Sequence, residues 1–212
     1  MKKLAFDIGS NNGIFADTII DKFETVICFE PIPYLIEGNL TLKSEKYCNI
    51  KIDPRAISDK NGSATMFICP DSYSISTLEN SWASSSRFSE HHVFTESINV
   101  STVTLEEAIN QYGIPEYIKI DIEGHEHAVL NAFNTLLNDT IFCFEWTEEF
   151  KNELIQTINH LDKIGYNKFY VSWEDKYLED KQISWQDKNT FLNFDSFIPE
   201  RKQLWGMIYF KK

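Results

Sequence analysis

The sequence predicts an α/β fold in which helices cover both faces of a mostly parallel sheet. Apolar segments of strand length alternate with segments of helical periodicity from the first residues onward, which is typical of parallel strands joined by helical crossovers. The strands are almost continuously apolar, as strands buried on both faces are. Neither a repeat nor a linker interrupts the 212 residues, so we expect a single domain over 1–212.

The expected strands are short apolar runs bounded by turn residues. They occupy 4–8, 25–29, 49–57, 64–68, 99–103, 117–122, 140–144, 166–173 and 203–210. Pro54 interrupts the third run, and Asp59-Lys60-Asn61-Gly62 is a typical hairpin turn between the third run and the fourth. The last two strands have no helical pattern between them, so we expect them to pair antiparallel at one edge.

The expected helices have apolar residues three and four positions apart. They occupy 13–23, 33–43, 124–137 and 148–164, and a further helix begins at Thr104. Thr104 and Glu107 have the spacing of a capping box. Residues 70–97 are rich in serine and lack periodicity. A loop of this length in a compact domain usually carries function.

Composition and charge exclude several classes of protein. With 42% apolar and 14% aromatic residues the chain is globular. Its net charge of −12 disfavours a nucleic-acid partner and an anionic membrane surface. There is no apolar run of about 18 residues, the length that would span a membrane. The four cysteines form no CxxC pair, so we expect buried, reduced thiols in a cytoplasmic protein.

The end of the first strand carries the most informative motif, Asp7-Ile8-Gly9-Ser10-Asn11-Asn12-Gly13. Glycines here allow a tight turn and a close approach of the backbone to a ligand. The spacing differs from the GxGxxG fingerprint of NAD enzymes. A carboxylate at this point would repel a pyrophosphate but accept a hydrogen bond from a cationic amine. The motif therefore favours a cofactor that carries an amino acid moiety.

The second strand ends in Phe29-Glu30-Pro31, and Glu30 follows Gly9 by 21 residues. An acid at this distance, at the tip of the second strand, can accept hydrogen bonds from both ribose hydroxyls of a nucleoside. Two acidic strand tips beside a glycine-rich turn suit S-adenosylmethionine, which has a positive sulfonium and no phosphate. After the third strand, Ala56 or Ile57 can line an adenine slot, and ordinary strand packing explains both residues equally well.

A second cluster of titratable residues lies in Ile118 to Glu126. Strand alternation predicts that Asp121 and Glu123 lie on one side, while His125 begins the following helix. Glu145, at the end of the next strand, is a neighbour of Asp121 in the expected sheet. Such a cluster can deprotonate a hydroxyl group, or it can hold a divalent cation that acidifies one.

Together these motifs resemble the FkbM family of S-adenosylmethionine-dependent methyltransferases. The matching segments follow the family's order over residues 4 to about 150. They are 6–13, Phe29-Glu30-Pro31, 56–62, 118–124 and Glu145-Trp146. The block 118–124 is the most specific of these segments, because glycine-rich turns occur in all such methyltransferases.

The resemblance implies a Rossmann-like class I methyltransferase fold, with a mostly parallel seven-stranded sheet, an antiparallel last strand and helices on both faces. It also implies O-methylation, often of a sugar hydroxyl in polysaccharide or secondary-metabolite synthesis. The residues that it assigns to the cofactor, together with those that the motifs suggest, are Asp7, Gly9, Asn11, Gly13, Glu30, Pro31, Ala56 and Asp121. Asp121 and Glu123 would flank the reacting methyl group.

Two departures from the family pattern affect the expected site. His125 stands where members often have a small residue, so the general base is left open between His125, Asp121 and Glu123. Helices that often precede the first strand in the family are missing here. We therefore expect a more open cofactor pocket, or one closed by a second subunit, a fused domain or a partner domain.

The expected reaction is in-line methyl transfer to an acceptor oxygen, accelerated mainly by holding the two reactants together. The acceptor is a sugar or glycan hydroxyl, and the loop 72–90 and the connection 175–201 border its cleft. A divalent cation bound by Asp121 and Glu145 is a variant of this mechanism. Two alternatives remain: a methyltransferase acting on a non-sugar small molecule or a protein, and a non-catalytic domain that retains the fold.

Overall fold

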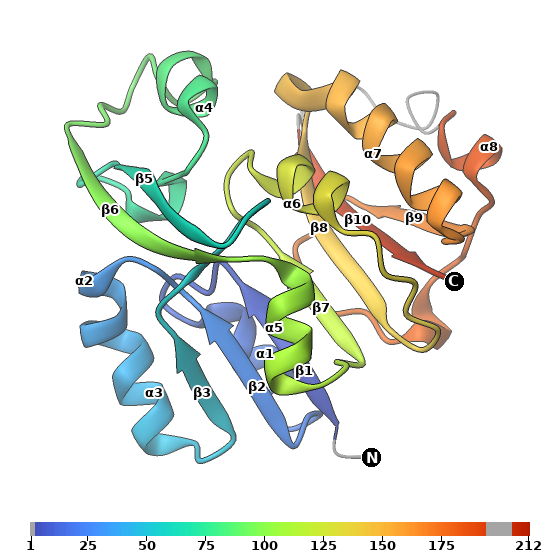
Figure 1. Ribbon diagram of the computed structural model, residues 1–212, viewed down its shortest axis with the longest axis horizontal. Coiled ribbons are helices and arrows are strands. Elements are labelled where there is room, and N and C mark those ends of the chain that lie inside the picture. Colours follow the sequence, from blue (N-terminus) through green and yellow to red (C-terminus); the bar gives the residue numbers. More distant parts are fainter. Residues whose placement is uncertain (1–2, 194–204) are drawn as a thin grey trace.

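A computed structural model describes residues 3–193 and 205–212 and is built around a seven-stranded sheet (Figure 1). Across the sheet the strands are β3 (Ile50–Asp53), β2 (Thr25–Phe29), β1 (Leu4–Ile8), β7 (Tyr117–Ile120), β8 (Ile141–Thr147), β10 (Trp205–Lys211) and β9 (Lys168–Ser172). The first five strands pair in parallel, and β10 is antiparallel to both of its neighbours. This arrangement confirms the predicted fold class, including the antiparallel pairing of the last two strands.

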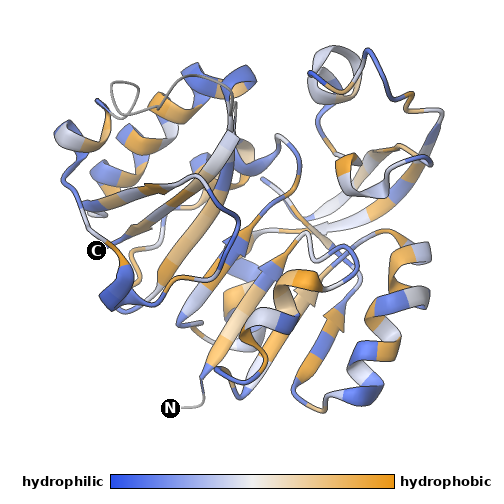
Figure 2. Ribbon diagram, turned by 180° about the vertical axis from the view of Figure 1, so that it is seen from behind, coloured by the Kyte–Doolittle hydropathy of each residue, from blue (hydrophilic) through white to orange (hydrophobic). Residues whose placement is uncertain are grey.

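Alternate residues of the central strands are buried in two separate cores, one on each face of the sheet. This is why these strands are largely apolar along their length. On one face, strand residues such as Phe6 and Phe144 pack against α5 (Leu105–Tyr112), α6 (Glu126–Ala132), α7 (Lys151–Ile164) and α8 (Lys188–Phe191). In Figure 2 the main-sheet strands are largely orange, whereas the helices carry both colours, as amphipathic helices do.

The opposite face is covered by helices and by a segment that is largely not helical. Its helical cover comes from α1 (Ile14–Ile19) and from the stretch α2 (Pro33–Leu35), η1 (Ile36–Leu40) and α3 (Thr41–Lys46). Beneath β10, Leu178 and Ile183 from the connection that holds η4 (Asp180–Gln182) are buried in the same core. The described part of the segment between β9 and β10 thus covers this face where a crossover helix would lie, and β9 and β10 need no such helix because they pair antiparallel.

A second, three-stranded sheet corrects the predicted hairpin. It consists of β4 (Ala56–Ile57), β6 (Glu96–Val103) and β5 (Gly62–Ile68), with β6 in the middle. β4 pairs in parallel with β6 and β5 antiparallel to it, so that Ala56 and Gly62 flank Thr102. The hairpin prediction was wrong because β4 and β5 do not pair with each other. Each pairs with one edge of β6, which is longer than the strand predicted there. The turn crosses the end of β6, where the Thr102 hydroxyl donates to the carbonyl of Lys60 at 2.9 Å.

The region expected as an irregular loop contains η2 (Tyr73–Ile75) and α4 (Asn80–Ser85). The η3 turn (Glu148–Phe150) precedes α7. The helix expected over 124–137 is shorter, because the chain after α6 becomes extended and its backbone donors find partners outside a helix. The N–H of Asn134 donates to Glu106 at 2.8 Å, and that of Leu137 donates to the Tyr166 hydroxyl at 3.1 Å.

The cysteine and membrane predictions are tested only in part. Cys28, Cys69 and Cys143 are buried free thiols, as expected, whereas Cys48 is exposed. Within 3–193 and 205–212, we find no helix with the length and apolarity needed to cross a bilayer. Of the connection expected over 175–201, residues 194–201 lie outside the part described, as does the start of the strand expected at 203.

Candidate functional site

The turn after β1 alternates between ordinary and left-handed backbone. Gly9, Asn11 and Gly13 have φ of 78°, 50° and 74°, and asparagine is among the few residues with a side chain that tolerate this region. A Cβ on Gly9 would lie 1.8 Å from the carbonyl oxygen of Asp121. The glycine therefore lets the turn after β1 touch the turn after β7.

Glu30 ties this first turn to the segment after β2. One carboxylate oxygen accepts a hydrogen bond from the N–H of Asn11 at 2.8 Å, and the other accepts from the N–H of Ile32 at 2.9 Å. Burial raises the pKa of Glu30 to about 7, although both backbone donors oppose the shift. A carboxylate has about four acceptor positions, so two hydrogen bonds leave Glu30 able to accept more from a ligand.

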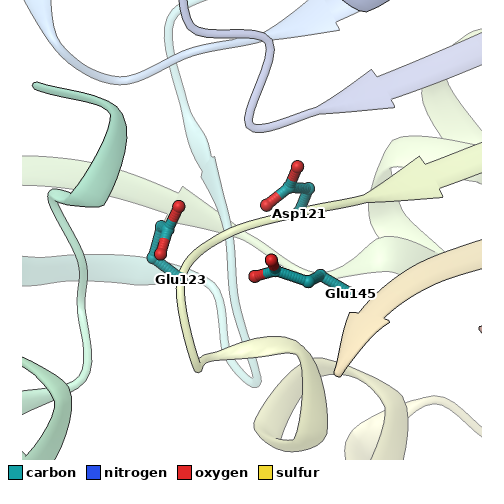
Figure 3. Close-up of side chains that lie close together, drawn as sticks. All are labelled: Asp121, Glu123 and Glu145. Carbon is teal, nitrogen blue, oxygen red and sulfur yellow. The ribbon is translucent and has the colours of Figure 1, made fainter. Parts of the chain in front are cut away.

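Asp121, Glu123 and Glu145 form a carboxylate trio at the carboxyl ends of β7 and β8 (Figure 3). One oxygen of each lies within 4.8 Å of one oxygen of each of the others. Burial, and then the negative charge of Asp121, raises the pKa of Glu123 and of Glu145 well above the usual value. The prediction that strand tips bring these residues together is confirmed.

The geometry that brings Glu123 into the trio is a turn and not the expected strand alternation. Glu123 has a left-handed backbone with φ of 56°. Two side chains hold it there. Glu126 accepts from the N–H of Ile122 at 2.6 Å and from that of Gly124 at 3.0 Å, while the buried Thr77 hydroxyl donates to the carbonyl of Glu123 at 2.7 Å.

Lys119 is a buried cation beneath the trio. Its ammonium donates to Asp121 at 2.8 Å and lies 3.9 Å from Asp175. Burial alone lowers the pKa of Lys119, but the charges of Asp121, Asp175 and Asp7 outweigh it and raise the pKa above its ordinary value. Lys119 therefore stays charged and offsets part of the negative charge collected at this edge.

The structure places two of the predicted site residues away from open space. Asp7 is fully buried, and burial raises its pKa to about 6. Neither of its carboxylate oxygens has a hydrogen-bond partner, while the charge of Lys119 acts on it. Gly13 lies at the start of α1, where a Cβ would meet the side chains of Lys43 and Leu40.

His125 is separated from the trio. Its Nε2 lies 3.0 Å from the hydroxyl of Ser58, and its Nδ1 lies 3.8 Å from a carboxylate oxygen of Glu79. Burial lowers the pKa of His125, and the charges of Glu79 and Asp59 oppose this. Its side chain thus links the start of α6 to the second sheet.

Two members of the trio, Asp121 and Glu123, border a cleft with two compartments. The inner compartment is largely apolar and is lined by Ile8, Gly9, Asn11, Phe29, Glu30, Pro31, Ile32, Ala56, Ile57, Met66, Tyr73, Ser74, Ser76, Leu78, Asp121, Ile122 and Glu123. The outer compartment is more polar and is lined by Gly9, Ser10, Asn11, Asn12, Ile14, Phe15, Thr18, Leu35, Asn39, Ser72, Tyr73, Ser74, Lys119, Asp121, Glu123 and Asp175. Asp121 and Glu123 lie where the compartments meet.

This arrangement of glycine turn, acidic strand tips and carboxylates agrees with a comparison of the sequence with protein families. The profile of the methyltransferase FkbM domain matches residues 7–168, which include every predicted site residue. The chain belongs to the FkbM methyltransferase family. Among curated proteins, none matches significantly.

Solved structures with a similar fold have low sequence identity to this chain, and several of them are methyltransferases. The methyltransferase FkbM from Methylobacillus flagellatus KT is 14% identical, with a TM-score of 0.53. The match covers 99% of this chain but only 43% of that protein. Precorrin-6y C5,15-methyltransferase from Geobacter metallireducens GS-15 is 10% identical with a TM-score of 0.49, and the match covers 100% of this chain and 82% of that chain. These likenesses show the fold, and the family match shows that the chain holds a methyltransferase domain.

The sequence analysis assigned no site role to three residues that hold the site, although one of them, Glu126, lies in the second cluster. Lys119 carried a usable signal, because a lysine inside the apolar run of a central strand must find a buried partner, and Asp121 is two positions away on the same face. Glu126 resembled an acid in the first turn of a helix. Thr77 carried no signal, since its contact depends on a strand order that was predicted wrongly.

Replacing Thr77 tests how firmly the turn at Glu123 is held. In Thr77→Val the buried carbonyl of Glu123 loses its donor and the N–H of Glu79 loses its acceptor, so we expect the free energy of unfolding to fall by about 1–3 kcal/mol. Thr77→Ser keeps the hydroxyl and should lose less. Urea denaturation of both variants measures this, and equal losses would show that the hydroxyl contributes nothing.

The stability of the fold should decrease with increasing pH. The pKa values of Asp7, Glu30 and Glu126 are raised to about 6, 7 and 8, mainly by burial. Folding favours their protonated forms, so their stabilising effect is complete below the pKa of the unfolded chain and is lost as the pH rises through the folded values. Urea denaturation from pH 5 to pH 8 should show a falling free energy of unfolding.

The matched variant for this experiment is Glu126→Gln, which does not titrate. We expect a shallower fall between pH 6 and pH 8 in this variant than in the parent chain. A free energy of unfolding that rises over this range in the parent would contradict the assignment.

Proposed function

We propose that this chain transfers the methyl group of S-adenosylmethionine to a sugar hydroxyl of a glycan or glycosylated metabolite. The observation that carries the proposal is the position of Asp121 and Glu123, two members of the carboxylate trio, where the inner and outer compartments meet. Groups that accept a proton thus lie between a compartment suited to a nucleoside and one suited to a polar acceptor. The family membership supports the methyl transfer, and the acceptor is the step beyond it.

The residues of the inner compartment fit the cofactor. Glu30 borders it with acceptor positions to spare, in keeping with a bond to ribose hydroxyls. Ala56, Ile57 and Met66 supply an apolar wall for a flat base. Four other residues predicted to bind the cofactor also line this compartment: Gly9, Asn11, Pro31 and Asp121. Asp7 and Gly13 do not line this compartment. Asp7 would contribute through its electrostatic interaction with Lys119, and Gly13 by allowing the backbone turn.

When bound, S-adenosylmethionine supplies an electrophilic methyl group on a positively charged sulfur. The negative charges of the trio would stabilise the positive charge on the sulfur. In the transfer, the acceptor oxygen would bond to the methyl carbon, and the sulfur would keep the electron pair of the broken bond. A carboxylate of the trio would accept the proton that the acceptor hydroxyl loses. We assign the base to Glu123, because it lines both compartments and its backbone is held by Thr77 and Glu126. Asp121 and Glu145 flank it. His125 serves as a positioning residue.

The buried thiols of Cys28, Cys69 and Cys143 support a reducing environment such as the cytoplasm. A divalent cation held by the trio is the variant that the oxygen spacing would also accommodate. The base mechanism needs no cation, so the two are separable by experiment.

Glu30→Gln tests the assignment of the cofactor site. An amide cannot replace the carboxylate toward two hydroxyls and two N–H groups, so we expect Kd for S-adenosylmethionine to rise roughly ten- to a hundredfold in calorimetry. Glu37→Gln, which removes an exposed acid from the nearby helical segment, is the control and should bind as the parent does. Unchanged affinity in Glu30→Gln would remove Glu30 from the site.

Glu123→Gln tests the base. We expect kcat for methyl transfer to a glycoside panel to fall by roughly 10²- to 10⁴-fold, the usual contribution of general base catalysis, with Kd for the cofactor nearly unchanged. Turnover of the parent enzyme should persist in EDTA. Loss of turnover in EDTA would assign the trio to a cation, and methylation of a protein panel in place of the glycosides would overturn the sugar acceptor.

A further inference from the structure

Two tyrosines stack on each other at the edge of the cleft. The ring centroids of Tyr34 and Tyr73 lie 5.0 Å apart at an interplanar angle of 22°. Tyr73 lines both compartments, whereas Tyr34 lies outside them and is 68% exposed. One tyrosine thus forms cleft wall, and the other supports it from outside.

Tyr73 also contacts the second sheet. Tyr73 packs against the core of the second sheet, which includes Ile32, Met66 and Val100. Its segment also continues to Thr77, whose backbone pairs with Phe67 and whose hydroxyl holds Glu123. The ring therefore belongs to a fixed element that also positions the proposed base.

The polar groups around Tyr73 suit an uncharged, hydroxyl-rich ligand. The outer compartment carries amide and hydroxyl side chains that can donate and accept hydrogen bonds: Asn11, Asn12, Thr18, Asn39, Ser72 and Ser74. Its charged lining residues are three acids, Asp121, Glu123 and Asp175, and one cation, Lys119. Lys119 is buried and pairs with two of these acids, so no described lining residue offers a free positive charge to an anion.

We propose that Tyr73, supported by Tyr34, stacks against one face of the acceptor sugar, and that the outer compartment selects uncharged sugars over phosphorylated or nucleotide-linked ones. This inference rests on the proposed function and names the residues that determine its specificity. The apolar C–H face of a pyranose covers an aromatic ring, while its hydroxyl edge meets the amides and hydroxyls. Phosphate groups would meet the acids of the same compartment and be repelled.

Labelled methyl transfer to matched acceptors tests the selectivity. The panel holds methyl glycosides of common hexoses and 6-deoxyhexoses, together with the 1-phosphate and nucleoside-diphosphate forms of the same sugars. We expect kcat/KM for the best methyl glycoside to exceed that of its phosphorylated forms at least tenfold. A preference for the phosphorylated forms would overturn the charge argument.

Substitution of the tyrosines tests the platform. With the best glycoside, Tyr73→Ala should raise KM roughly three- to tenfold, the usual contribution of an aromatic contact, with kcat and Kd for the cofactor unchanged. Tyr73→Phe should behave as the parent, and Tyr34→Ala should raise KM less than Tyr73→Ala does. Ile114→Ala, at an exposed apolar residue outside both compartments, is the control and should leave KM unchanged.

A binding measurement separates the failures. Saturation-transfer NMR of the methyl glycoside on protein loaded with S-adenosylhomocysteine should show strong transfer to the C–H protons of one ring face, lost in Tyr73→Ala. If glycosides are methylated and Tyr73→Ala changes neither KM nor this transfer, the platform is wrong and the proposed function stands. If Tyr73→Ala weakens the cofactor instead, Tyr73 belongs to the nucleoside pocket. If no sugar is methylated although the cofactor binds, both fail.

Discussion

The site depends on the contact between the turn after β1 and the turn after β7. Gly9 approaches the carbonyl of Asp121 so closely that no side chain fits between them. This approach sets the distance from the glycine turn to Asp121 and Glu123, and all of these border both compartments. Glu30 then fixes the first turn and Glu126 fixes the second, each by accepting two backbone N–H bonds. On both sides of the cleft, a buried carboxylate that accepts two backbone hydrogen bonds thus fixes the turn.

Collecting so many acids at one edge of a sheet carries an electrostatic cost. Burial raises the pKa of Asp7, Glu30, Glu126 and two members of the trio. Lys119 is the buried counter-charge, and it lies on the face of the sheet that holds Asp7, its cross-strand neighbour. A cationic cofactor beside these acids would lower their pKa values. These acids therefore make this part of the fold less stable than its contacts alone suggest, which is common where function requires like charges together.

The sequence allowed the main sheet and most of the site to be predicted because both follow from strand ends. Apolar runs located each central strand, and the acids at or near the carboxyl ends of β1, β2, β7 and β8 had to lie toward one edge of a parallel sheet. The second sheet was beyond reach, since the turn at 59–62 looks the same whether its strands pair directly or with β6 between them. For the same reason Thr77 and the orientation of His125 could not be inferred: both contact partners that only this strand order brings near.

The order of the chain also separates two tasks that meet in space. Residues that border the inner compartment come mostly from the ends of the main-sheet strands, while Tyr73 and its serine neighbours come from the segment between β5 and β6. That segment interrupts the chain between β3 and β7 without altering the main-sheet order. Substitutions there can reshape the wall of the outer compartment while the strand-end residues keep their places, provided that Tyr73, which also lines the inner compartment, and Thr77, which holds Glu123, are retained. A fold arranged in this way can diversify its acceptors over evolutionary time while its cofactor chemistry stays the same.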